Sequence, residues 1–122
     1  MDYSNLGLLA LRLAMGVVFI YHGLPKVRSA KKLAPMVGMS AGMVLFVGLV
    51  EILGGLGVIT GLLFKLSALG LAIVMLGALY FKLVKWHVPF SAMDKMGWEF
   101  DIVLLAGALV LLLGGGGSLV LF

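Results

Sequence analysis

The chain has 122 residues, of which 63% are hydrophobic and only 11% are charged. A soluble domain of this size needs more polar surface, since its usual apolar share is nearer one half. The net charge of +4 comes from basic residues in short segments between apolar runs, which favours lipid headgroups over nucleic acid as their partners. The absence of cysteine excludes thiolate catalysis, disulfide exchange and cysteine-ligated metal centres.

Four apolar segments predict an all-α fold, an integral membrane four-helix bundle that forms a single domain over residues 1–122. The segments cover residues 6–24, 41–63, 66–83 and 100–121, and each is close to the ~20 residues that cross a bilayer. The first has neither a basic start nor a small-residue cleavage site, so we expect it to remain as a membrane helix. None alternates apolar and polar residues as the strands of a membrane barrel do.

The connections between these segments differ in charge. Residues 25–40 hold four basic residues and predict a short interfacial helix, with Arg28, Lys31 and Lys32 on one face. Residues 82–98 hold three more, together with aromatic residues that suit the headgroup region, whereas the second connection has only Lys65. This asymmetry predicts that the two longer connections are cytoplasmic and that both termini are outside.

Two charged residues lie at bilayer depth, Arg12 in the first segment and Glu51 in the second. A charge there costs about 2.5–3.5 kcal/mol on insertion scales, so such residues normally face the bundle interior and pair. The two segments run in opposite directions, and the axial offset between the residues is ~6 Å, which an arginine side chain can span. We therefore predict an Arg12–Glu51 ion pair or a water-bridged version of it, either as a lock between helices or as part of a site in which Glu51 handles protons.

Small residues flank both charges. The first segment carries a stripe spaced by three and four residues, which places its members on one helix face: Arg12, Gly16, Phe19, Gly23 and Lys26. In the second segment, the residues around the carboxylate are Gly48, Gly54 and Gly55. Such stripes allow either another helix or a flat ligand to approach the backbone closely, and both interpretations stay open.

A second polar group is expected at the cytoplasmic helix ends, made of His22, Lys26, Lys82, Lys85, His87, Glu99 and Asp101. Taken singly, such residues are usually polar edge groups, and Glu99 is also a favourable acidic helix start. As a collection they suit proton exchange or headgroup binding. The two histidines lie too far apart in sequence to give a metal-ligand spacing, so no metal site is predicted.

Three motifs in order carry a family resemblance. The stretch RLAMGVVFIYHGLPK, Arg12 to Lys26, resembles the first-helix motif of the DoxX family of small membrane proteins. Residues 48–63, GLVEILGGLGVITGLL, and residues 97–119, GWEFDIVLLAGALVLLLGGGGSL, are similar to its second and last helices. The terminal glycines lack the proline and arginine that the family often has there. The resemblance implies a four-helix bundle in a prokaryotic cytoplasmic membrane.

The resemblance also implies function. Family members are linked to quinone-coupled sulfur oxidation, as small subunits of thiosulfate:quinone oxidoreductases, and to membrane assemblies that handle oxidative stress with soluble redox enzymes. More distant eukaryotic relatives act as cargo receptors or assembly chaperones. Carried over to this sequence, the resemblance implies candidate site residues at Arg12, His22, Lys26, Glu51 and Glu99.

The leading hypothesis is therefore a quinone-binding membrane subunit of an oxidoreductase or redox-stress assembly. The quinone is expected on the glycine-lined face, beside Phe19 or Trp86, with Arg12 or His22 bonding a carbonyl. The proposed proton-exchanging residues are Glu51 and Glu99, and the remaining ligand-binding candidates are Lys26, Gly55 and His87. Electrons are expected from a soluble or membrane redox partner protein, and a homo-oligomer in the lipid is compatible with this scheme.

Two alternatives stay open. One is a non-catalytic membrane scaffold or chaperone that binds a partner protein through its glycine faces. The other is a small dimeric transporter or channel. Small multidrug transporters match in size and helix number, but their essential glutamate lies in the first helix, where this chain has Arg12.

Overall fold

The protein is all-helical in a computed structural model that describes residues 3–91, 93, 96–115 and 117. The described elements are α1 (Ser4–Arg28), α2 (Ala30–Val37), α3 (Ala41–Thr60), α4 (Phe64–Tyr80), the π-helical segment η1 (Phe81–Lys85) and α5 (Trp98–Gly114). The predicted fold class is confirmed. Among the described residues, α1, α3 and the continuous α4–η1 segment are long and apolar enough to cross a membrane.

The first helix is longer than predicted, because α1 continues past Pro25 to Arg28. Proline keeps a helical φ but has no N–H, so the last turn of α1 lacks one backbone hydrogen bond at Pro25 while the helix continues. The interfacial helix expected after it is present as α2, whose Lys31, Lys32 and Met36 are exposed while Ala34 is buried. The connection between the first two long helices is thus an ordered amphipathic segment.

The turn between α3 and α4 is tight. Gly61 ends α3 with φ +89°, and its N–H donates to the carbonyl of Gly57. Only glycine adopts this left-handed conformation without strain, which explains why the helix stops here. Residues Gly57 and Ser67 then touch across the turn, since a Cβ at Gly57 would lie 1.9 Å from Ser67 Oγ.

The last helix is shorter than predicted. The sequence suggested a helix over residues 100–121, whereas α5 has 17 residues and ends at Gly114, next to Gly115 with φ +80°. Consecutive glycines lower helix propensity, so the end falls where the glycine run begins. Residues 116 and 118–122 of that expected helix lie outside the described residues.

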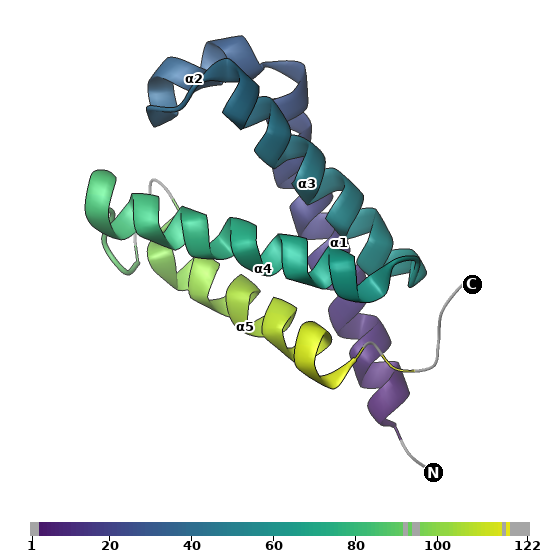
Figure 1. Ribbon diagram of the computed structural model, residues 1–122. Helices are drawn as coiled ribbons and strands as arrows, with labels where there is room; N and C mark the ends of the chain where they lie inside the picture. Colours follow the sequence, from purple (N-terminus) through teal and green to yellow (C-terminus); the bar gives the residue numbers. More distant parts are fainter. Residues whose placement is uncertain (1–2, 92, 94–95, 116, 118–122) are drawn as a thin grey trace.

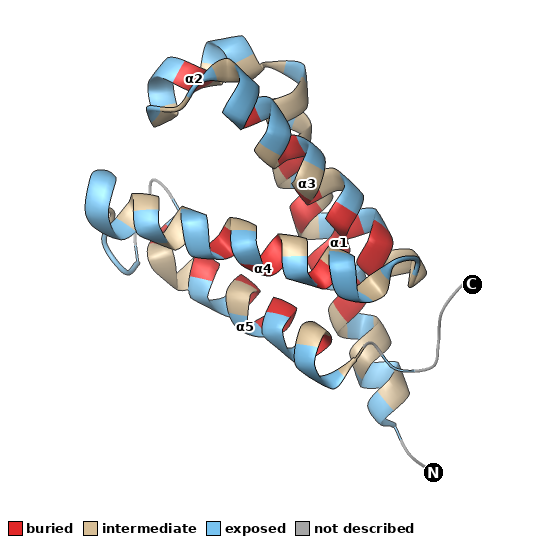
Figure 2. Ribbon diagram, viewed as in Figure 1, coloured by how far each residue is buried: buried red, intermediate tan, exposed pale blue. Residues whose placement is uncertain are grey.

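The helices form two antiparallel pairs, α1 with α3 and α4 with α5 (Figure 1). The pairs meet near the α3–α4 turn, where α1 begins and α5 ends, and diverge toward the end that carries α2 and η1 (Figure 1). Buried residues concentrate where the pairs cross, and exposed residues cover the outer helix faces (Figure 2). The core there includes Phe19, Val58, Leu71, Ala108 and Leu111.

A glycine seam holds α1 against α3. A Cβ at Gly16 would lie 2.7 Å from the Gly55 carbonyl oxygen, and a Cβ at Gly23 would lie 2.8 Å from the Gly48 carbonyl oxygen. Both distances are too short for any side chain, so the two backbones are in direct contact. The packing interpretation of the glycine stripe therefore holds, because α3 itself covers that face of α1.

This seam predicts that adding one methyl group to a glycine of α1 destabilises the protein by an amount that depends on the position of the glycine. Gly16→Ala should lower the free energy of unfolding by about 1–3 kcal/mol, because the methyl meets backbone that cannot rotate away. The matched control is Gly7→Ala on the same helix, where an added Cβ has no neighbour within 4 Å and helix propensity improves. Unfolding in detergent, followed by circular dichroism, measures both. Equal stability of the two variants would contradict a backbone-to-backbone seam.

Candidate functional site

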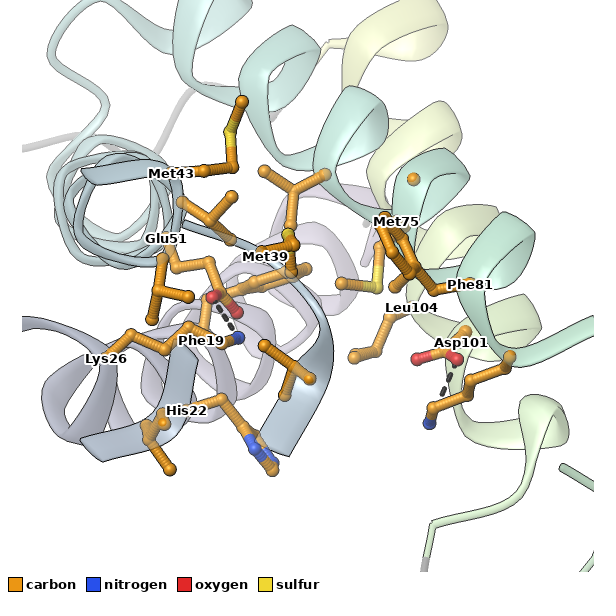
Figure 3. A pocket seen from close by; sticks show the side chains of 18 of the residues that line it. Phe19, His22, Lys26, Met39, Met43, Glu51, Met75, Phe81, Asp101 and Leu104 are labelled. Atoms are coloured by element: carbon orange, nitrogen blue, oxygen red, sulfur yellow. Dashed lines mark hydrogen bonds and ion pairs between the residues drawn. The ribbon is translucent and has the colours of Figure 1, made fainter. Parts of the chain in front are cut away.

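A cavity of about 760 Å³ lies between the two helix pairs, toward the end where they diverge. Its walls come from α1, α2 and α3 on one side and from α4, η1 and α5 on the other, as Figure 3 shows from close by. Most of the lining is apolar. The charged, polar and ring-nitrogen side chains that reach it are His22, Lys26, Ser40, Glu51, Lys82, Trp86 and Asp101.

The first polar group is an ion pair between Lys26 and Glu51, which joins α1 to α3 (Figure 3). Glu51 is 1% exposed, whereas the lysine side chain is 31% exposed. The glycine seam positions the pair, because Gly48 touches Lys26 Cβ and Gly23 packs beside Glu51 Cβ. The buried carboxylate is thus neutralised by a cation on the neighbouring helix.

The predicted Arg12–Glu51 pair is wrong for the described residues, since Glu51 pairs with Lys26 instead. Arg12 is fully buried and donates from Nε to the Val58 carbonyl at 2.7 Å and from a terminal nitrogen to the Ile59 carbonyl at 2.9 Å. These carbonyls belong to the last turn of α3, where unpaired acceptors and the helix dipole favour a cation. The seam register places Gly16 beside Ile59, so Arg12 faces the end of α3 and lies far along the helix from Glu51.

Arg12 therefore ties α1 to the α3–α4 turn. Its guanidinium carbon also lies 5.8 Å from the centroid of the Phe64 ring at the start of α4. A cation over an aromatic face adds further attraction. Arg12 does not line the cavity, and its contacts with Val58, Ile59 and Phe64 join α1 to the end of α3 and the start of α4.

The second polar group is on the opposite wall. Lys82 Nζ of η1 lies 3.0 Å from Asp101 Oδ2 in the first turn of α5, and Asp101 is 3% exposed. The contact is short enough for an ion pair, but its direction does not satisfy a hydrogen bond. Within the described part of the chain, Asp101 Oδ2 accepts no hydrogen bond. Lys82 also approaches the Gly97 carbonyl at 3.5 Å and the Phe100 ring at 5.7 Å.

His22 and further aromatic residues also line the cavity. The His22 ring lies 5.3 Å from the Phe100 ring, centroid to centroid, and so connects α1 with α5. Phe19 is 1% exposed and lines both the core and the cavity. Trp86 lines the wall that follows η1 and packs against Phe81 at 5.4 Å. Flat aromatic walls beside a titratable ring are suited to a planar ligand.

Several predicted site residues lie elsewhere. Gly55 is part of the seam, His87 is exposed with φ +51°, and Glu99 directs its backbone N–H to the Phe90 carbonyl at 3.0 Å. None of these three, nor Arg12, lines the cavity. Of the residues singled out from sequence for binding or catalysis, the cavity brings together Phe19, His22, Lys26, Glu51 and Trp86.

Sequence reasoning underrated Asp101 and Lys82. Both were placed in a general cytoplasmic cluster, and Glu99 was preferred as the acidic residue of the last helix. The helical register separates the two acids by two positions, which turns them to different faces of α5. An acidic residue followed directly by the apolar run of α5 was the available signal, because it predicts a carboxylate that faces the bundle interior.

The amphipathic helix α2 covers one side of the cavity. Leu33 and Val37 line it, and Met39 and Met43 continue the same wall into α3. The exposed Lys31 and Lys32 lie on the outer face of α2, where they can meet lipid headgroups.

Helices and cavity together define a class: a small multi-pass membrane protein with an internal, largely apolar cavity. The charges of the two ion pairs in its walls sum to zero. Residues 7–86, more than half of the chain, match the DoxX family, and the chain belongs to that family.

A curated relative supports the same assignment. The chain is 29% identical over 120 residues to the Bacillus subtilis (strain 168) protein named "Putative oxidoreductase CatD", and the match covers 96% of this chain and 85% of that protein. No solved structure matches the chain. The membrane assignment rests on the family and on the apolar helices.

The revised pairing predicts which residues share an interaction energy. Lys26→Met should destabilise the protein strongly, because it leaves the Glu51 carboxylate buried without its cation. The double variant Lys26→Met/Glu51→Gln should recover much of that loss, giving an interaction energy of about 1–3 kcal/mol. Arg12→Met combined with Glu51→Gln should be additive within about 0.5 kcal/mol. Chemical unfolding in detergent of wild type, the three single variants and the two double variants measures both cycles. A larger energy for the Arg12 cycle would restore the original pairing.

Proposed function

We propose that this chain is a quinone-binding membrane subunit of an oxidoreductase system and that the cavity between the helix pairs is its quinone site. The observation that carries the proposal is the cavity itself: about 760 Å³, mostly aliphatic and aromatic, with a few polar groups that include two ion pairs on opposite walls. Its size is within the usual range for small-molecule sites, which are mainly apolar with a few placed polar groups. An amphiphile with a compact headgroup fits that division.

The chain's own residues fit the headgroup of a quinone. The Lys26 side chain is 31% exposed, and an ammonium group has three donors, so it can donate to a carbonyl oxygen in addition to Glu51. His22 can donate or accept at the same end, and Phe19 and Trp86 offer flat apolar surfaces for the ring. The aliphatic walls would hold the first part of a hydrocarbon tail, whose remainder would extend into lipid.

The redox chemistry needs a second protein. Reduction of a quinone to a hydroquinone consumes two electrons and two protons. Glu51, Asp101 and His22 are the titratable cavity groups that can hold or pass protons. The electrons are expected from a redox partner protein, soluble or in the membrane, since the chain has no cysteine to supply them. The name of the Bacillus subtilis relative supports a role in an oxidoreductase system.

The proposed setting is the cytoplasmic membrane of a prokaryote, with both termini outside. In that orientation α2 and η1 face the cytoplasm, because the basic connections are retained on that side. The polar end of the cavity is then near the cytoplasmic surface, where a soluble redox partner could reach it. In this arrangement the lipid-soluble ligand approaches the cavity from within the membrane, and the aqueous partner approaches it from the cytoplasm.

Filling the cavity tests the proposal directly. Val74→Phe adds volume to the cavity wall of α4 and should lower the amount of quinone that co-purifies, or the affinity for an added short-tailed quinone, by roughly tenfold or more. Mass spectrometry of extracted small molecules and calorimetric titration in detergent measure these two quantities. The matched control is Leu76→Phe on the same helix, which is 56% exposed and does not line the cavity.

The alternative outcomes are informative. If wild type carries only bulk phospholipid and binds no added quinone, the cavity is not a quinone site, and the scaffold or chaperone function becomes the better explanation. If both variants lose quinone equally, binding occurs on the lipid-facing surface instead. Loss confined to Val74→Phe supports the proposed site.

A further inference from the structure

The facing surfaces of α3 and α4 touch near the turn that joins them and separate farther along. A Cβ at Gly54 would lie 2.8 Å from the Leu71 side chain, and a Cβ at Gly70 would lie 3.3 Å from the Val50 side chain. Two turns beyond Gly70, on the same face of α4, a Cβ at Gly77 would have no neighbour within 4 Å. The helices are therefore in contact up to the level of Val50 and Gly70, and they diverge beyond it (Figure 1).

The residues beside this divergence line the cavity and are also exposed. They are Met43 and Phe46 of α3 and Ile73 and Gly77 of α4. The exposed fractions are 49% for Met43, 61% for Phe46 and 59% for Ile73, and Gly77 is exposed as well. Met75, which lines the same cavity farther inside, is only 5% exposed. Residues that line a cavity and are exposed mark its opening, so the cavity opens sideways between α3 and α4.

The composition of this opening suits a hydrocarbon chain. Both helices are long and apolar enough to cross a membrane, and residues 41–50 of α3 and 66–81 of α4 include no charged residue. Across the cavity, by contrast, α1 and α5 are connected by the His22 and Phe100 rings, 5.3 Å apart. An opening bordered by exposed apolar side chains is stable where its surroundings are lipid, because water would solvate such a surface poorly.

The size of the cavity makes an opening of this kind necessary for a membrane lipid. A volume of about 760 Å³ is that of a site for a drug-sized molecule. A ligand with a long chain can place its headgroup and the first part of the chain inside, and the remainder has to leave through an opening that contains no charge. The gap between Met43 and Phe46 on one side and Ile73 and Gly77 on the other meets that requirement.

We propose that this gap is a lateral portal, through which a lipid ligand enters the cavity from the bilayer and through which its hydrocarbon chain extends while the headgroup is bound. The inference rests on the proposed quinone site and specifies where the chain of the ligand lies. Gly77 keeps the portal open because it has no side chain, and Phe46 and Ile73 border the chain on the two helices.

The test maps the chain of a bound probe. The probe is a benzoquinone whose isoprenoid chain carries a photoreactive diazirine several carbon atoms from the ring, added to the full-length protein in lipid nanodiscs. Peptide mass spectrometry after illumination should place the label within residues 43–50 and 70–77, and unlabelled long-chain quinone should displace it. Gly77→Phe should reduce this labelling by about tenfold, because the ring fills the gap.

A second ligand separates the portal from the headgroup space. The same benzoquinone without a chain, titrated calorimetrically, should bind wild type and Gly77→Phe with affinities within about twofold, because its ring needs no portal. The control variant is Gly7→Phe, at another exposed glycine with no neighbour within 4 Å and outside the cavity lining, and it should behave as wild type with both ligands. Ile73→Trp fills the portal from a second position and should repeat the result of Gly77→Phe.

Three results would overturn the portal while leaving the quinone site intact. They are label on α1, α2 or α5 in place of the two portal ranges, labelling that survives in both portal variants, and an equal loss of the chainless ligand, which would place Gly77 and Ile73 in the headgroup space. A different result defeats the proposed function: wild type that binds no chainless quinone and whose label is not displaced by long-chain quinone. A phospholipid with a diazirine in its acyl chain then decides the portal, since label in the two ranges keeps it for a phospholipid chain and absence of label there overturns it.

Discussion

The direct backbone contact between α1 and α3 is the constraint on which the rest of the structure depends. Four glycines at two levels, Gly16 with Gly55 and Gly23 with Gly48, bring the helices together without intervening side chains. A contact of this kind permits one register, because a one-residue shift would place a side chain against a carbonyl oxygen. The register in turn decides the polar contacts, because it places Lys26 beside Glu51 and Arg12 beside the carbonyl groups at the end of α3.

The two helix pairs divide the molecule into a packed end and an open end. Arg12, the tight turn at Gly61 and the core around Leu71 close the packed end, whereas the pairs diverge around the cavity at the other. Charged groups within a membrane protein are costly, and burying an ion pair is weak evidence of stabilisation. Two such pairs, Lys26–Glu51 and Lys82–Asp101, lie on opposite walls of one cavity.

The sequence supported a large part of this description. Apolar length predicted the membrane helices α1, α3 and α4, and the basic connection predicted α2, because both features depend on local composition. Phe19, His22, Lys26 and Glu51 were singled out from sequence, and all four line the cavity. Their role in binding a quinone stays a prediction. The extent of the last helix was overestimated, since an apolar run continues past the glycines at which α5 ends.

What the sequence by itself determined was the class of protein, the approximate position of its helices and the existence of charges that must find partners within the membrane. Which partners they find was decided by tertiary structure alone. Arg12 and Glu51 are compatible in axial distance, yet the glycine seam places each beside a different group, because backbone contact fixes register more strictly than a flexible side chain can. Likewise Glu99 and Asp101 are equivalent in sequence, and only the packing of α5 against η1 and α1 turns Asp101 into the cavity and leaves Glu99 outside it.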